Sequence, residues 1–124
     1  MSTYACTRPV TGTQDLDATA NRRMDNIRNI AQTIALRAGY TPWSTPVIEY
    51  ANTITRSIGN DTDIVSKEMF RLEGDNDLIL RPEGTAPLMR AVLEKTRGQQ
   101  LPLYVQYCGP MFRRENPQAG RYRQ

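Results

Sequence analysis

Residues 109–124, GPMFRRENPQAGRYRQ, hold four arginines and one glutamate. A guanidinium presents a planar fork of donors that matches two oxygens of a phosphate, and a nearby carboxylate can accept from an exocyclic amine. If this segment continues a strand, Arg113 and Glu115 share one face of the sheet while Arg114 points away. The pattern therefore predicts that Arg113 and Glu115 face one ligand together.

The loop that follows, residues 116–123, contains the turn formers Asn, Pro and Gly and two further cations, Arg121 and Arg123. Its natural partner is the phosphate of a nucleotide or of a nucleic-acid backbone. A solvated basic turn without a ligand is the simpler interpretation, and the composition leaves both open.

A second group of residues stands in LRPEGTAP, residues 80–87. Glu83 and Thr85 lie where a predicted strand meets the start of a predicted helix, so backbone N–H groups and a carboxylate come together. Such a junction can hold a zwitterion. In the simpler interpretation, Glu83 only offsets the helix dipole and Thr85 only caps the helix.

The amino-acid composition limits the kinds of active site that this chain can form. The chain has 124 residues, enough for one small domain, and no histidine, which excludes a Ser/His or Cys/His nucleophile and the commonest metal ligand. Cys6 and Cys108 are far apart and lack metal-ligand spacing, so we expect reduced thiols and no protein-ligated metal. Residues 113–124 alone carry a formal charge of +3, equal to that of the whole chain. Chemistry here must depend on carboxylates, arginines and backbone groups.

Location follows from what the sequence lacks. It has no apolar stretch of transmembrane length, and its first residues lack the apolar core of a secretion signal. We therefore expect a cytoplasmic protein with no membrane partner, with an organelle matrix as the other option.

Hydrophobic spacing predicts the elements that position these residues. Apolar residues recur every three or four positions over 18–37, which predicts an amphipathic helix for core or interface packing, closed by Gly39. Residues 41–50 (TPWSTPVIEY) predict an edge or interface strand, and 58–63 a loop.

The second half of the chain predicts a hairpin, a helix and a strand. Alternating runs at 69–72 and 78–81 flank EGDND, which indicates a hairpin loop longer than the tightest turns. A helix over about 86–96 follows, with Thr85 as its N-cap and Pro87 in its first turn. Residues 101–109 predict a half-buried strand. This order favours an α+β fold, an antiparallel sheet with helices on one side.

Several segments in the same order, TGTQDL, TPWSTPVIEY, SIGNDTDIVSKEMF, LRPEGTAPLMR and GPMFRRENPQAGRYR, resemble the class II aminoacyl-tRNA synthetases, and among them the histidine–tRNA ligases. The resemblance runs along nearly the whole chain. It implies that residues 1–124 form the N-terminal portion of a catalytic domain, an antiparallel sheet flanked by helices, that works as a homodimer. Residues 18–37 and 41–50 resemble the family's first motif, the dimer interface.

The resemblance also implies a reaction. Histidine and ATP, with Mg²⁺, would give histidyl-adenylate and pyrophosphate, and the histidyl group would then pass to tRNA(His). Glu83 and Thr85 would hold histidine, and Arg113 would bridge its carboxylate and the ATP α-phosphate. Glu115 would bind the adenine amine and Arg121 the distal phosphates. The tRNA acceptor end would be contacted by Asn116, Gln118 and Arg123.

The family's remaining parts do not occur within these 124 residues: the return strand of the second motif, a third motif and an anticodon-binding domain. We therefore expect the N-terminal part of an active ligase. The alternative is a catalytically inactive, truncated subunit that contacts RNA or supports a larger assembly. A synthetase-like regulatory subunit of histidine biosynthesis is a further option, but it would not need the PEGT and FRRE residues.

Overall fold

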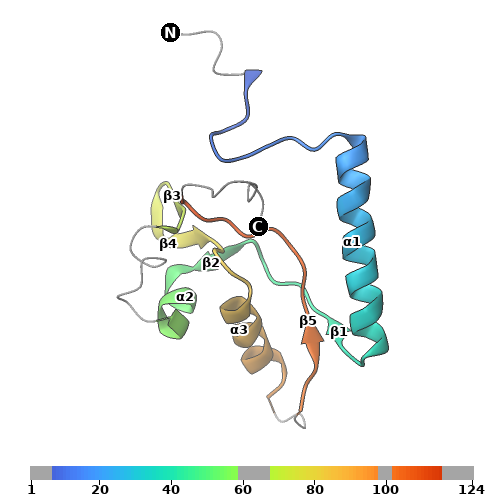
Figure 1. The fold of residues 1–124 in the computed structure, drawn as a ribbon. Helices are drawn as coiled ribbons and strands as arrows, with labels where there is room; N and C mark the ends of the chain where they lie inside the picture. The colour runs from blue at the N-terminus through green and yellow to red at the C-terminus, as the bar shows by residue number, and fades with distance from the viewer. Residues whose placement is uncertain (1–6, 59–67, 98–101, 116–124) are drawn as a thin grey trace.

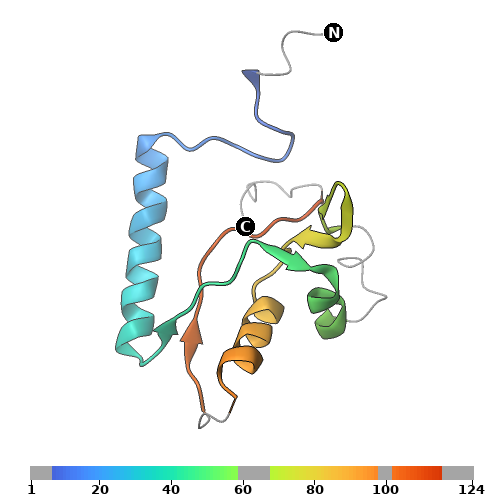
Figure 2. The same cartoon turned by 180° about the vertical axis from the view of Figure 1, so that it is seen from behind.

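The computed structural model describes residues 7–58, 68–97 and 102–115. Along the chain these form α1 (Ala18–Arg37), β1 (Thr41–Pro42), β2 (Ile48–Tyr50), α2 (Ala51–Ile58), β3 (Arg71–Leu72), β4 (Asp75–Leu80), α3 (Thr85–Lys95) and β5 (Val105–Gln106). Figure 1 shows α1 at one side of the molecule and the β2–β4–β3 sheet at the other. Seen from behind, α3 again lies between the β1–β5 pair and α2 (Figure 2).

Helix α1 has the bounds that the sequence predicts. The Asp17 side chain accepts a hydrogen bond from the Ala20 N–H at 2.7 Å and caps the first turn. At the other end Gly39 takes a left-handed conformation, φ 85°, and the Tyr40 N–H bonds back to the Ala35 carbonyl. Both end signals were present in the sequence, so the helix was predictable to the residue.

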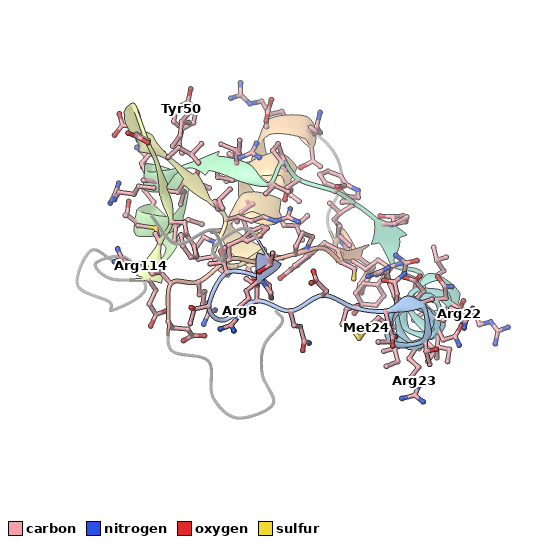
Figure 3. All side chains as sticks on the ribbon, turned by 90° about the horizontal axis from the view of Figure 1, so that it is seen from above. Arg8, Arg22, Arg23, Met24, Tyr50 and Arg114 are labelled. Carbon is pink, nitrogen blue, oxygen red and sulfur yellow. The ribbon has the colours of Figure 1, made fainter. Side chains whose placement is uncertain are left out.

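The face of α1 that carries the isoleucines is not covered by the rest of the chain. Ile27, Ile30 and Ile34 are 63, 61 and 63% exposed, and no residue of α1 is buried. No part of the described chain packs over these isoleucines, so they do not belong to the hydrophobic core of the described residues. Arg22 and Arg23 project from the same helix away from the remainder of the protein (Figure 3).

The antiparallel sheet has the order β2–β4–β3 and carries the core on one face. Glu49 of β2 lies opposite Ile79 of β4, and both are buried, whereas the neighbouring Ile48 and Tyr50 are exposed on the other face. Ile79 packs with Ile54 of α2, with Ala86 of α3 and with Met69, which precedes β3. Both helices therefore cover the same face of the sheet; of the two helices that the sequence predicted on one side, only α3 packs in this core.

An ion pair joins the sheet to α3. The Arg90 guanidinium donates two hydrogen bonds to the Glu49 carboxylate, at 2.7 and 3.1 Å, and a third to Glu94 at 3.2 Å. The hydrogen bond to Glu49 raises the pKa of Arg90 above its ordinary value, so this side chain stays charged.

The hairpin turn is tighter than we expected. Leu72 pairs with Asp75 across a two-residue turn of Glu73 and Gly74, and Gly74 takes a φ of 88° that favours glycine. The extra residues are instead absorbed by an irregularity in the ladder between Arg71 and Leu72. The prediction of a long EGDND loop was wrong.

Helix α2 was missed. Its sequence, ANTITRSI, is rich in Thr, Asn and Ser, which are weak helix formers, and it follows β2 without an intervening loop. Ile54, fully buried against Ile79, gives the helix its place in the core. Tertiary packing rather than local propensity therefore accounts for this element.

The predicted strand over 101–109 is reduced to β5, which pairs parallel with β1 through Thr41↔Val105 and Pro42↔Gln106. A separate parallel pair was not predicted. After β5 the chain makes isolated backbone hydrogen bonds rather than a ladder: the Phe112 N–H donates to the Arg81 carbonyl, and the Arg114 N–H to the Glu68 carbonyl. No strand runs through residues 107–115, so a strand ending in Arg113 and Glu115 was a wrong expectation.

Candidate functional site

The junction between β4 and α3 is organised by the Glu83 carboxylate. One carboxylate oxygen accepts from the Thr85 N–H at 2.6 Å and the other from the Ala86 N–H at 2.8 Å. These are two of the N–H groups that a helix leaves unsatisfied at its start, and a negative charge here also opposes the helix dipole. Glu83 therefore acts as the cap of α3.

Thr85 is not the N-cap that the sequence predicted. The cap position is Gly84, which makes no side-chain cap hydrogen bond, and Thr85 is the first residue of the helix. The carboxylate of Glu83 takes over the role that the Thr85 hydroxyl was expected to play. This leaves the Thr85 hydroxyl free for another contact, with the phenol oxygen of Tyr107 at 3.1 Å.

Tyr107 is a site residue that sequence reasoning missed. Its ring lies so close to Gly84 that a Cβ on that glycine would collide with it, and the same Cβ would come within 2.8 Å of the Met111 side chain. Gly84 is thus required for close approach of the two segments. The PEGT glycine was a signal for such an approach, but it did not say which residue would approach.

Arg113 lies at the same junction. Its Nε donates to the Pro82 carbonyl at 3.0 Å, one residue before Glu83. The guanidinium is half-buried, and the described residues give its two terminal nitrogens no hydrogen bond. Within the described residues, Arg113 is therefore anchored on the residue before Glu83, with both terminal nitrogens unbonded, and the Glu83 carboxylate is anchored at the start of α3.

This arrangement suits a ligand that carries both charges. The free nitrogens of Arg113 can bind two oxygens of a carboxylate or phosphate, while the Glu83 carboxylate can accept from an ammonium group. The Thr85 and Tyr107 hydroxyls add polar groups beside them. The Arg113–Pro82 hydrogen bond brings Arg113 to the residue before Glu83, and the use of Glu83, Thr85 and Arg113 as one binding site stays a prediction.

The other predicted contacts are only partly placed. Glu115 is exposed at a bend and not in a strand, so strand alternation does not place it on one face with Arg113, and its contact with a ligand stays a prediction. Arg114, also exposed, lies far from α1 (Figure 3). The predicted ATP contact Arg121 and the predicted tRNA contacts Asn116, Gln118 and Arg123 lie outside the described residues.

The described residues contain neither a metal-binding cluster of side chains nor a membrane-spanning helix. Within residues 7–58, 68–97 and 102–115, no three His, Cys, Asp or Glu side chains are grouped so as to hold a metal ion. In those same ranges, no helix is both long and apolar enough to span a membrane. Cys108 is an exposed free thiol, and Cys6 lies outside the described residues.

Comparison with known proteins supports the resemblance seen in the sequence. The family model for histidyl-tRNA synthetase matches residues 12–124. A histidine–tRNA ligase from Gluconacetobacter diazotrophicus is 45% identical over 119 residues, which is 94% of this chain and 29% of that protein. The chain thus spans less than a third of the length of this relative.

Solved structures agree with the fold. A histidine–tRNA ligase subunit from Alicyclobacillus acidocaldarius superposes with a TM-score of 0.75 at 27% identity, over 86% of this chain and 31% of the other. A Bacillus halodurans protein described as an ATP phosphoribosyltransferase regulatory subunit/histidyl-tRNA synthetase gives 0.72 at 25%, over 88% and 28%. The α+β fold is thus that of the class II synthetase catalytic domains, and the family match over residues 12–124 shows that this chain belongs to the histidyl-tRNA synthetase family.

Proposed function

We propose that residues 1–124 are the N-terminal portion of the catalytic domain of a histidine–tRNA ligase, which activates histidine with ATP and transfers it to tRNA(His). The supporting observation is the anchoring of Arg113 on the Pro82 carbonyl, next to the capping carboxylate of Glu83. The family match adds the substrate class. The chain covers 29% of the first relative's length, so the activity belongs to the protein at its natural length.

In the proposed first step, a histidine carboxylate oxygen attacks the ATP α-phosphorus. A new O–P bond forms, and the bond to the pyrophosphate leaving group breaks. Arg113, which would bind both the carboxylate and the α-phosphate, neutralises the charge that gathers on the phosphoryl oxygens. Mg²⁺ enters as part of the ATP substrate complex.

Glu83 and Thr85 would hold the amino acid during this step. The Glu83 carboxylate already accepts two backbone N–H groups, and each oxygen has a second lone pair that can accept from the histidine ammonium or a ring nitrogen. Holding the nucleophile and the phosphate in one geometry lowers the barrier mainly by orientation.

Several finer roles are part of the same proposal. Glu115 would bind the adenine amine and Arg121 the distal phosphates, while Asn116, Gln118 and Arg123 would contact the tRNA acceptor end. A cytoplasmic location is proposed with them, with an organelle matrix as the alternative, because tRNA is used wherever proteins are synthesised.

A homodimer is also proposed, with α1 at its interface. The exposed isoleucines of α1 form an apolar stripe that the described chain leaves uncovered, and exposed apolar patches of this kind mark interaction sites. No observation specifically favours an inactive RNA-contacting subunit.

The test is histidine-dependent exchange of labelled pyrophosphate into ATP by the protein at its natural length. We expect exchange with histidine and none above background with the other standard amino acids. A protein of natural length that forms no histidyl-adenylate would instead be a structural or regulatory member of the family.

A further inference from the structure

Arg81, which directly follows β4, is buried, and no carboxylate of the described residues pairs with it. It is 6% exposed, and among the described residues no Asp or Glu lies within ion-pair distance. Its guanidinium is satisfied by neutral acceptors: Nε donates to the Pro110 carbonyl at 3.0 Å, and one terminal nitrogen donates to the Thr45 carbonyl at 2.8 Å and the Thr45 hydroxyl at 2.9 Å. A buried charge held in this way is costly, so its position calls for a reason.

The acceptors belong to segments far apart in the sequence. Thr45 lies 36 residues before Arg81 and Pro110 lies 29 after it. The backbone of Arg81 reaches the same two segments, because its N–H donates to the Val47 carbonyl at 2.9 Å and its carbonyl accepts from the Phe112 N–H at 3.0 Å. Side chain and backbone together thus fasten three chain segments at one residue.

The fastened segments carry the proposed site. Phe112 directly precedes Arg113, and the Pro82 carbonyl that anchors Arg113 directly follows Arg81. The hydrogen bonds made at Arg81 therefore fix the chain on both sides of the Arg113–Pro82 contact: Phe112, which precedes Arg113, and Arg81 itself, which precedes Pro82. The Gly109 backbone also packs against the guanidinium so closely that a Cβ there would collide with its second terminal nitrogen.

We propose that Arg81 is a positioning residue for adenylate formation, acting through Arg113. The inference rests on the proposed function and adds a residue to it. An arginine is needed because its planar fork holds Nε and a terminal nitrogen at a fixed angle, so it can bond to two segments at once, whereas the lysine ammonium is a single flexible charge.

The test compares Arg81→Lys with Arg90→Lys in the protein at natural length. Both changes keep the charge, and Arg90 is a matched control because its ion pair with Glu49 supports the fold away from the site. The measurement is the single-turnover rate of histidyl-adenylate formation per active site. We expect Arg81→Lys to lower this rate on the order of 10²-fold, as small misplacements of reacting groups do, with the KM for ATP and histidine little changed. Arg90→Lys should stay near the wild-type rate.

A double-mutant cycle with Arg113→Lys separates positioning from a general structural role. If Arg81 acts through Arg113, adding Arg81→Lys to Arg113→Lys should lower the rate less than about threefold. The full effect of Arg81→Lys in that background would overturn the inference, as would an unchanged rate for Arg81→Lys alone.

If Arg81→Lys does not fold, Thr45→Val removes a single acceptor and should still lower the rate about threefold, with an unchanged rate counting against the inference. If the wild-type protein forms no histidyl-adenylate, the proposed function itself fails, and the inference fails with it.

Discussion

At the scale of single residues, Glu83 combines two roles that are usually assigned to different side chains. It closes the start of α3 through the Thr85 and Ala86 N–H groups, and in the proposed function it would also meet the cationic end of histidine. Because the helix already holds the carboxylate in position, little freedom is left to lose when a ligand binds. This favours a cap that is also a recognition group.

Glu83→Gln separates the two roles. An amide can accept through only one of its two polar atoms, so one N–H loses its acceptor, and we expect unfolding free energy to fall by about 1 kcal/mol. Loss of the charge should raise the KM for histidine roughly tenfold or more, measured by pyrophosphate exchange. The matched control is Glu94→Gln, the same chemical change near the other end of α3. A histidine KM equal to wild type would show that Glu83 only caps the helix.

Sequence patterns can single out residues that lie close together in the chain, but not residues that only the fold brings together. Glu83 and Thr85 stand together in the chain, and the PEGT pattern indicated both. Tyr107 and Arg81 become site residues only because residues 107–112 fold back onto residues 81–84. No spacing in the sequence records that contact.

At the scale of elements, the ion pair between β2 and α3 illustrates how strongly burial changes the value of a charge. The Glu49 side chain is 4% exposed, whereas that of Arg90 is 35% exposed and also reaches Glu94. Loss of the ion pair should therefore cost more when Glu49 is left without Arg90 than when Arg90 is left without Glu49.

Removing the partners one at a time should reveal this inequality. Arg90→Met leaves Glu49 buried without a cation, and we expect a loss of about 3 kcal/mol. Glu49→Met leaves an arginine that can turn to solvent and to Glu94, so the expected loss is about 1 kcal/mol. Urea unfolding of both variants measures the difference. Equal losses, or the reverse order, would contradict this account of the β2–α3 contact.

Local sequence signals decide which helices and strands could be predicted. α1 has a capping aspartate, a regular apolar stripe and a terminating glycine, so local information was sufficient. α2 has none of these signals and depends on Ile54 packing against Ile79. The β1–β5 pair joins residues such as Thr41 and Tyr104, which are 63 positions apart, and local patterns cannot specify such a pairing.

At the scale of the whole molecule, α1 offers an uncovered apolar stripe while the proposed site lies elsewhere, at the β4–α3 junction. We expect Ile30→Asp to convert a homodimer to a monomer, because a charge at the centre of the stripe would be buried without a partner. Sedimentation velocity on the protein at natural length measures this. Asn29→Asp places the same charge beside the stripe and should leave the dimer intact. A dimer that survives Ile30→Asp would show that its interface lies on another surface.

In the proposed function, Arg113, held on the Pro82 carbonyl, neutralises the charge that develops when histidine is activated. Arg113 and Arg114 are neighbours with the same side chain, but only Arg113 is anchored at the site, while Arg114 is exposed. The decisive measurement is the single-turnover rate of histidyl-adenylate formation for Arg113→Lys and Arg114→Lys in the protein at natural length. Loss of bidentate binding should lower the Arg113→Lys rate on the order of 10²-fold, and Arg114→Lys should stay within about threefold of wild type. Equal rates for the two variants would contradict the account.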